Sequence, residues 1–306
     1  MGTVDTRELV LEVLLLITRD GEYSHIALRN VLSKYQFLKK QDRAFITRVV
    51  EGTLERMIEL DYIIDQYSKV KVSKMKPVIR TIMRSSVYQM KYMDSVPSAA
   101  VCNEAVKLAV RKGFVNLKGF VNGVLRTIDR NLDHIAYPEG LKGLSVKYSM
   151  PEWVLEDWLA VYDPDTVEGI LRDFLLEKPT SIRCVLHKTT KEDLKERLRQ
   201  EGVKVEEKSI LPYALLISGY DHLGMLASFR EGLFQVQDVS SMMVAEWAAP
   251  KAGDRIIDVC AAPGGKALHL ADKLAVLGSG HVEARDLTDH KIEMIEENIA
   301  RVGAKN

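Results

Sequence analysis

The residues best suited to chemistry in this sequence form the string Asp258-Val259-Cys260-Ala261-Ala262-Pro263-Gly264-Gly265-Lys266. It follows an apolar, strand-like run (255–260) and precedes a helical pattern, Ala267–Leu277. Gly264 and Gly265 permit a sharp turn and a close approach to a ligand, because they carry no side chain. The first N–H groups of a helix have no partner within it and can hold a carboxylate or phosphate. The string therefore predicts an anion-binding turn.

Two common ligands of such turns do not fit these residue types. A nucleotide triphosphate loop has glycine six residues before its lysine and Ser or Thr directly after it, whereas here Cys260 and Ala267 occupy those places. A dinucleotide turn has three spaced glycines, which residues 262–265 do not supply. S-adenosylmethionine remains as a third use of this geometry, with its methionine portion at the turn. The alternative is a structural turn that binds no cofactor.

A second strand-like run, His281–Arg285, ends at Asp286. A carboxylate at this place can accept hydrogen bonds from both hydroxyls of a ribose. Dinucleotide-binding folds use an acidic residue in this way, some twenty residues after their glycines. Asp286 is therefore the predicted ribose ligand.

The string and its flank Phe234–Trp247 closely resemble the RNA cytosine-carbon-5 methyltransferases, and in particular the RsmB (Sun, or Fmu) family that modifies small-subunit ribosomal RNA. The spacing of Lys291, Asn298, Arg301 and Gly303 after Asp286 is similar to that family's second motif. The resemblance implies a Rossmann-like methyltransferase domain and S-adenosyl-L-methionine as cofactor. The predicted cofactor-binding residues are Cys260, Ala261, Ala262, Pro263, Gly264, Gly265, Lys266 and Asp286.

The resemblance also implies a covalent mechanism, because carbon 5 of cytosine is not nucleophilic enough to take the methyl group directly. In enzymes of this type a cysteine thiolate adds to carbon 6, and the resulting enamine attacks the methyl sulfonium. The family places these cysteines in Thr-Cys and Pro-Cys motifs on later strands. Neither motif occurs here, where Cys102, Cys184 and Cys260 are the cysteines. We therefore predict no catalytic residue, a chain that ends within its methyltransferase domain, weak cofactor binding at best, and no methylation by the chain itself.

The first 132 residues are predicted to form a bundle of helices. Apolar residues recur at helical spacing in six stretches, Arg7–Thr18, Ser24–Lys34, Gln41–Gln66, Val78–Tyr92, Ser98–Arg111 and Asn116–Arg130. The strings Gln41-Asp42-Arg43 and Phe120–Arg126, with the helix entry Pro97–Glu104, resemble the NusB-like domain. That resemblance implies an RNA-binding bundle.

The charge of the chain is unevenly distributed, although its formal net charge is zero. Residues 1–130 contain 22 Lys and Arg against 14 Asp and Glu, a net charge of +8, and the remainder carries −8. Such a basic region predicts contact with RNA phosphates, although any single lysine can equally belong to a solvated helix face. The candidates are Lys74, Lys76, Arg80, Arg84, Lys107 and Arg111.

Residues 145–232 are predicted to form a small α+β subdomain. Helices are expected after Pro151 and from Asp163 to Leu176, followed by a strand at Ser181–Leu186. A helix (Lys191–Gln200) and two strands (Val203–Glu206 and Ala214–Ser218) complete it. The unit resembles the segment that precedes the methyltransferase core in the family and helps to seat RNA. Arg183 is its candidate RNA contact, with a plain surface charge as the alternative.

The composition excludes several other classes. An apolar content of 46% with 28% charged residues is typical of a soluble globular protein. We find no signal sequence and no apolar run near the roughly 18 residues that span a membrane, so a cytoplasmic location is expected. A monomer is expected as well. Three scattered cysteines favour neither a disulfide framework nor a metal site.

The predicted fold is multidomain: an all-α NusB-like bundle (1–132), an α+β connector (145–232) and the start of an α/β Rossmann-like methyltransferase domain (233–306). The predicted function is S-adenosylmethionine-dependent methylation of carbon 5 of a cytosine in small-subunit ribosomal RNA. The alternative is a non-catalytic NusB-like RNA-binding protein with a vestigial methyltransferase tail.

Overall fold

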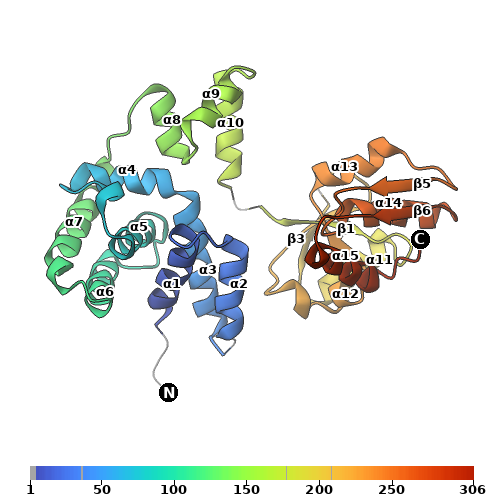
Figure 1. Ribbon diagram of the computed structural model, residues 1–306, viewed down its shortest axis with the longest axis horizontal. Helices are drawn as coiled ribbons and strands as arrows, with labels where there is room; N and C mark the ends of the chain where they lie inside the picture. Colours follow the sequence, from blue (N-terminus) through green and yellow to red (C-terminus); the bar gives the residue numbers. More distant parts are fainter. Residues whose placement is uncertain (1–4, 36, 177, 208) are drawn as a thin grey trace. The chain divides into compact units, whose positions relative to one another are not determined.

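The computed structural model describes residues 5–35, 37–176, 178–207 and 209–306. The chain divides into two compact units, Met1–Leu176 and Glu177–Asn306. Among the described residues, the regular structure of the first unit is helical, and the second unit contains two sheets with covering helices (Figure 1).

The first unit begins with a helical bundle. Its α-helices are α1 (Thr6–Thr18), α2 (Ser24–Lys34), α3 (Lys40–Glu55), α4 (Met57–Tyr67), α5 (Pro77–Tyr92), α6 (Ser98–Arg111) and α7 (Lys118–Asn131). The single helix predicted over Gln41–Gln66 is wrong in one respect, since the structure has two helices there. Arg56, between them, leaves the helical region at φ −102° and ψ 15°. Apolar periodicity runs through both helices, so it could not reveal the break.

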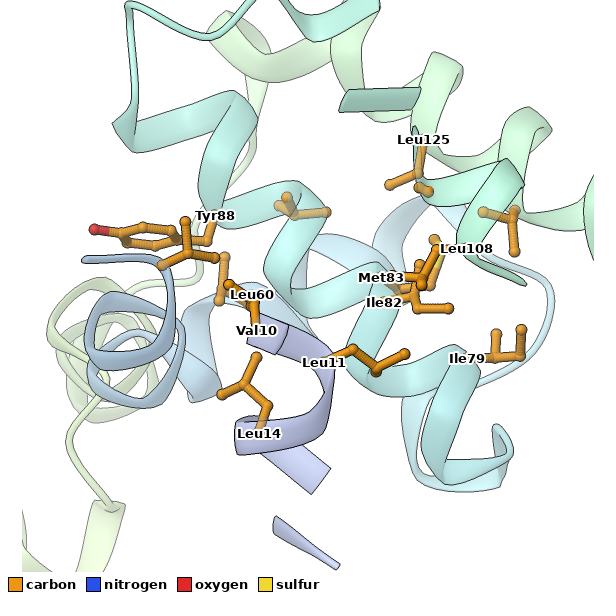
Figure 2. Packing of buried hydrophobic residues seen from close by; sticks show 14 of the residues in the cluster. Val10, Leu11, Leu14, Leu60, Ile79, Ile82, Met83, Tyr88, Leu108 and Leu125 are labelled. Carbon is orange, nitrogen blue, oxygen red and sulfur yellow. The ribbon is translucent and has the colours of Figure 1, made fainter. Parts of the chain in front are cut away.

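Helix α5 is the centre of the bundle. It packs against α1, α3, α4, α6 and α7, and its side chains Ile79, Ile82 and Met83 are buried. Figure 2 shows Leu11 of α1 and Leu108 of α6 in the same core. Full burial of one such side chain stabilises a fold by about 1.5–3 kcal/mol. The predicted amphipathic faces therefore meet around one common helix.

Three further helices complete the first unit: α8 (Gly140–Tyr148), α9 (Glu152–Leu159) and α10 (Pro164–Phe174). The sequence did not predict α8, which packs against α4. The buried carboxylate of Glu59 accepts hydrogen bonds from the hydroxyls of Tyr92 and Tyr137, the latter at 2.5 Å. The Glu59 amide donates to Ser149 Oγ at 3.0 Å. These bonds fasten residues 137–149 to the bundle.

The boundary between the two units falls inside the range 145–232 that the sequence suggested as one subdomain. Helices α8–α10 share a small core of their own, which includes Tyr148, Leu155 and Leu171. The strands that follow belong to the second unit. The division into three domains stays a prediction.

The second unit starts with a four-stranded antiparallel sheet of order β2-β3-β1-β4. Its strands are β1 (Thr180–Cys184), β2 (Lys204–Glu206), β3 (Ala214–Ser218) and β4 (Phe234–Val236), with helices α11 (Lys191–Gln200) and α12 (Ala227–Arg230). Ile182, Leu215 and Phe234 lie in its buried core. The predicted strands and the predicted helix 191–200 are present at these places.

A parallel β–α–β unit follows, as the sequence predicts. Helix α13 (Val239–Ala248) leads into β5 (Arg255–Asp258), α14 (Gly265–Val276), β6 (His281–Ala284) and α15 (Asp289–Val302). The register pairs Arg255 with His281 and Asp258 with Ala284. Ile257 and Val259 remain 54% and 67% exposed, which leaves apolar surface beside β5. We expect this surface to favour aggregation.

Candidate functional site

The turn between β5 and α14, residues 259–264, is built by backbone hydrogen bonds and is called the Pro263 turn below. The Gly264 amide donates to the Ala261 carbonyl at 2.6 Å, and the Gly264 carbonyl accepts from the Leu268 amide at 2.8 Å. Gly264 has φ +103°, a conformation that residues with a side chain rarely adopt. The turn ends at α14, whose first amides, of Gly265, Lys266 and Ala267, have no acceptor within the helix. The helix therefore presents a partial positive charge there.

The end of β6 meets this turn because the two strands are parallel. The Arg285 amide donates to the Asp258 carbonyl at 2.8 Å, and the Ala261 amide donates to the Arg285 carbonyl at 2.9 Å. Asp286 Oδ2 then accepts from the Ala262 amide at 2.9 Å. The predicted turn and the predicted acid, 24 residues apart in the chain, are thus in direct contact.

Asp286 carries two further hydrogen bonds, both on Oδ1. Lys291 Nζ donates to it at 2.9 Å and the Leu287 amide at 2.7 Å. Lys291, followed by the two amides, lowers the pKa of Asp286 to about 2. A carboxylate offers about four acceptor positions, so these bonds leave one, on Oδ2. Asp286 is a stable anion with a single free acceptor position.

A pocket of about 250 Å³ opens beside the turn. Of the predicted cofactor-binding residues, six line it: Cys260, Ala261, Ala262, Pro263, Gly265 and Lys266. Gly264 and Asp286 do not line it. Asp286 contacts the pocket wall through Ala262, and Gly264 is a buried residue of the turn itself. The pocket wall therefore follows the predicted string closely.

The remaining wall residues were not predicted as site residues. They are Val236, Gln237, Asp238, Ser241 and Asp258. Four of them lie in the flank Phe234–Trp247, so the resemblance of that flank was the available signal. Asp238 caps α13 by accepting from the Ser240 amide at 2.8 Å, and hydrogen bonds from Ser240 lower its pKa. Both pocket carboxylates, Asp238 and Asp258, suit a ligand with a positive group.

Arg183 does not occupy the place predicted for it. Its side chain is only 1% exposed, and its Nη1 donates to Asp272 Oδ2 at 2.8 Å. Its Nε donates to Gln237 Oε1 at 2.9 Å. Burial lowers the pKa of Arg183, and Asp272 opposes that effect. The prediction of RNA contact is corrected: a guanidinium enclosed between β1 and α14 cannot reach a phosphate.

The carboxylate of Asp272 completes this buried network. It accepts from the amides of Leu186 and His187, at 3.0 and 2.9 Å, and from His187 Nδ1 at 2.6 Å. A buried ion pair is tolerated when hydrogen bonds satisfy the remaining positions. The network joins the antiparallel sheet to the helix that begins at the Pro263 turn.

The predicted RNA contacts in the bundle differ in their exposure and in their ion pairs. Lys74 and Lys76 are exposed next to a short 3₁₀ turn, Val72–Lys74. Arg84, by contrast, forms two hydrogen bonds of 2.6 Å with Asp61, and its side chain is 12% exposed. This pairing argues against the predicted phosphate contact of Arg84.

The other three candidates are Lys107, Arg111 and Arg80. Lys107 is exposed and bonds Glu104 at 2.8 Å, and Arg111 is exposed and bonds Asp5 and Glu8. Arg80 is half-buried. Surface ion pairs are weak and exchange readily, so Lys107 and Arg111 can still reach phosphate.

The three cysteines lie in two kinds of surroundings. Cys102 and Cys184 are buried, and burial raises the pKa of the Cys184 thiol to about 12. Burial also raises the pKa of Cys102, so both stay protonated thiols, which are poor nucleophiles. Cys260 is exposed but lies in the turn itself, in the pocket wall.

No helix in the described part of the chain combines the length and apolarity that crossing a membrane requires. Among the same residues, no group of three His, Cys, Asp or Glu side chains is arranged to hold a metal ion.

Comparison with known proteins shows the class to which this chain is similar, the ribosomal RNA methyltransferases. Family profiles described as the NusB family, a RsmF/B-like ferredoxin-like domain and the 16S rRNA methyltransferase RsmB/F match residues 4–130, 150–221 and 245–306. The crystal structure of PH0851 shares the fold over 99% of this chain and 68% of its own, with a TM-score of 0.76 and 22% identity.

Two curated relatives narrow the class to one family. The probable ribosomal RNA small subunit methyltransferase B of Bacillus subtilis is 33% identical over 99% of this chain and 67% of its own length. The corresponding protein of Synechocystis is 30% identical over 98% and 67%. The chain belongs to the ribosomal RNA small subunit methyltransferase B family. It spans about two thirds of the length of these relatives.

Proposed function

We propose that this chain binds S-adenosylmethionine at the Pro263 turn and contributes to methylation of carbon 5 of a cytosine in small-subunit ribosomal RNA, acting as a monomer in the cytoplasm. The observation that carries the proposal is the meeting of the α14 N-terminus and Asp286 at one sheet edge, beside a pocket of about 250 Å³. Membership of a ribosomal RNA methyltransferase family supports the choice of ligand and substrate.

The pocket has groups that complement each part of the methyl donor. The methionine portion carries a carboxylate and an ammonium. We assign its carboxylate to the first amides of α14, and its ammonium to the side of Asp238 and Asp258. Asp286 accepts the ribose hydroxyls. Since it has one free acceptor position, Lys291 has to move aside for both hydroxyls to bind.

We further propose that the described residues supply donor binding and RNA contact but no catalytic nucleophile. Addition to carbon 6 of cytosine requires a thiolate, and Cys102 and Cys184 are buried thiols. Cys260 is part of the donor pocket. The 306-residue chain is therefore expected not to methylate RNA by itself.

The second candidate is a non-catalytic RNA-binding protein. One observation favours it: the Ala262 amide already donates a hydrogen bond to Asp286, as expected of a turn with a purely structural role. The two functions differ in donor binding, which only the first requires.

The deciding experiment is a calorimetric titration of the full chain with S-adenosylmethionine, paired with a transfer assay on small-subunit ribosomal RNA and labelled donor. We expect weak but saturable donor binding and no label in the RNA above background. Absence of binding would leave the RNA-binding alternative, and measurable transfer would contradict the assignment of no nucleophile.

For RNA contact, we expect the double substitution K74E/K76E to weaken binding to a small-subunit ribosomal RNA fragment roughly tenfold at moderate salt. Both side chains are exposed, and each lost phosphate contact lowers the slope of log K against log salt by about 1. The measurement is a salt series of binding titrations. Lys142, exposed on α8, supplies the control K142E/K147E with Lys147; an equal loss in both variants would reject a specific interface.

A further inference from the structure

Asn298 on α15 connects the Pro263 turn to the antiparallel sheet. Its Nδ2 donates to the Pro263 carbonyl at 3.0 Å and to the Met294 carbonyl at 3.1 Å. Its Oδ1 accepts from Arg301 Nη2 at 3.1 Å and from Gln235 Nε2 at 3.4 Å. Both ends of the amide are therefore engaged, each with a partner of the matching type.

The orientation of this amide is set by Arg301, because a guanidinium can only donate hydrogen bonds. Arg301 is itself held in place. Its Nη1 donates to the carbonyls of Phe229 and Phe234, both at 3.1 Å, and its guanidinium carbon lies 4.1 Å from the centre of the Phe229 ring. Its Nη2 also donates to Gln235 Oε1. Burial lowers the pKa of Arg301.

The hydrogen bond from Asn298 Nδ2 to the Pro263 carbonyl acts on the peptide group between Pro263 and Gly264. The Pro263 carbonyl and the Gly264 amide belong to one planar peptide group, so holding the oxygen also holds the N–H. That N–H closes the turn on the Ala261 carbonyl at 2.6 Å. Gly264 has no side chain that would restrict its φ of +103°, so the bond from Asn298 adds to the bond within the turn in holding this peptide.

We propose that Asn298, oriented by Arg301 and Gln235, is a positioning residue for the methyl donor: it fixes the Pro263–Gly264 peptide and thereby the direction of the first amides of α14. This inference rests on the proposed donor site. Asn298 does not line the pocket, so it acts on the donor only through the turn. The antiparallel sheet is thereby coupled to the donor site through one chain of hydrogen bonds.

The substitution N298D separates positioning from folding. An aspartate keeps an oxygen toward Arg301 and strengthens that bond with a charge, but it turns a second oxygen toward the Pro263 carbonyl, where a donor is needed. We expect an affinity for S-adenosylmethionine about tenfold lower, which corresponds to about 1.4 kcal/mol. The unfolding midpoint is expected to stay close to that of the unsubstituted chain.

Two measurements on the full chain test the proposal: calorimetric titration with S-adenosylmethionine, and amide hydrogen exchange at Gly264 followed by NMR. The control is E297Q, an exposed position on the same helix, for which neither value should change. In N298D the Gly264 amide hydrogen should exchange several-fold faster than in the unsubstituted chain. Unchanged affinity and exchange in N298D would overturn the proposal, as would a lowered unfolding midpoint with unchanged affinity.

The exchange measurement needs no ligand, so it distinguishes this inference from the proposed function. If the unsubstituted chain binds no donor while the Gly264 amide still exchanges faster in N298D, the proposed donor site is wrong. The hydrogen bonds from Asn298 would then still be shown to hold the turn. If the unsubstituted chain binds and N298D binds equally well, the donor site stands and the positioning role falls.

Discussion

Replacing Asp286 with alanine is expected to reduce the affinity of this chain for S-adenosylmethionine roughly 100-fold. The variant loses the only carboxylate at the end of β6 that touches the Pro263 turn, and with it the acceptor for two ribose hydroxyls. It also leaves the Ala262 amide without its 2.9 Å partner. Calorimetric titration of both proteins measures the effect directly.

Control variants separate the loss of the carboxylate from a general disturbance of the strand. E283Q changes an exposed acid on β6 that pairs with Arg285 and should leave affinity unchanged. D286N keeps an oxygen for the Ala262 amide but places an NH₂ group against two other donors, Lys291 Nζ and the Leu287 amide, so an intermediate loss is expected. Equal affinity of D286A and the unsubstituted chain would remove Asp286 from the donor site.

The pH dependence of donor binding follows from the pKa of about 2 at Asp286. Because the pKa lies below that of an ordinary aspartate, near 3.9, the carboxylate is ionised throughout the range from about pH 5 to pH 8. The contribution of the Asp286 carboxylate to donor binding is fully present above about pH 3.9, and it is lost only as the pH falls through the lowered pKa of about 2. Titration of Asp286 should therefore cause no change in donor affinity over that range, which calorimetric titrations from about pH 5 to pH 7 would measure.

Replacing Arg183 with methionine is expected to destabilise the second unit by about 3–5 kcal/mol. Methionine fills a similar volume but removes the guanidinium that pairs with the buried Asp272 carboxylate, which keeps only its hydrogen bonds from Leu186 and His187. It also removes the partner of Gln237 Oε1. Unfolding of the full chain by denaturant, followed by a probe in the second unit, measures the loss. The RNA affinity should remain unchanged at temperatures where the variant is folded.

The matched comparison is R197M, because Arg197 forms ion pairs with Glu201 and Glu231 in the same unit while 45% exposed. Such pairs contribute about 0–1 kcal/mol, so R197M should be nearly neutral. If R183M instead weakened RNA binding without loss of stability, the earlier interpretation of Arg183 as an RNA contact would be restored.

Sequence reasoning was most successful where the signal is local. The Pro263 turn, β5, α14 and β6 were predictable because the glycines, the apolar strands and the helical period lie within about thirty residues. Helix α8 was not predicted, because glycines such as Gly140 and Gly143 are unfavourable in helices. In the fold, its start packs beside the Pro138 backbone, where a side chain at Gly143 would lie 2.2 Å from the carbonyl oxygen.

The sequence by itself determined the family, the two kinds of architecture and the string that forms the pocket wall. Only the tertiary structure decided which charged residues are available. The sequence predicted Arg183 and Arg84 to be surface cations. In the fold, Arg183 pairs with Asp272, which is 89 positions away, and Arg84 pairs with Asp61, which is 23 positions away. Likewise the pairing of Asp286 with Ala262, and of Asn298 with Pro263, depends on parallel strands and a helix that meet at one edge. Burial and hydrogen-bond partners arise from chain segments brought together by packing, so residue type and spacing could not specify them.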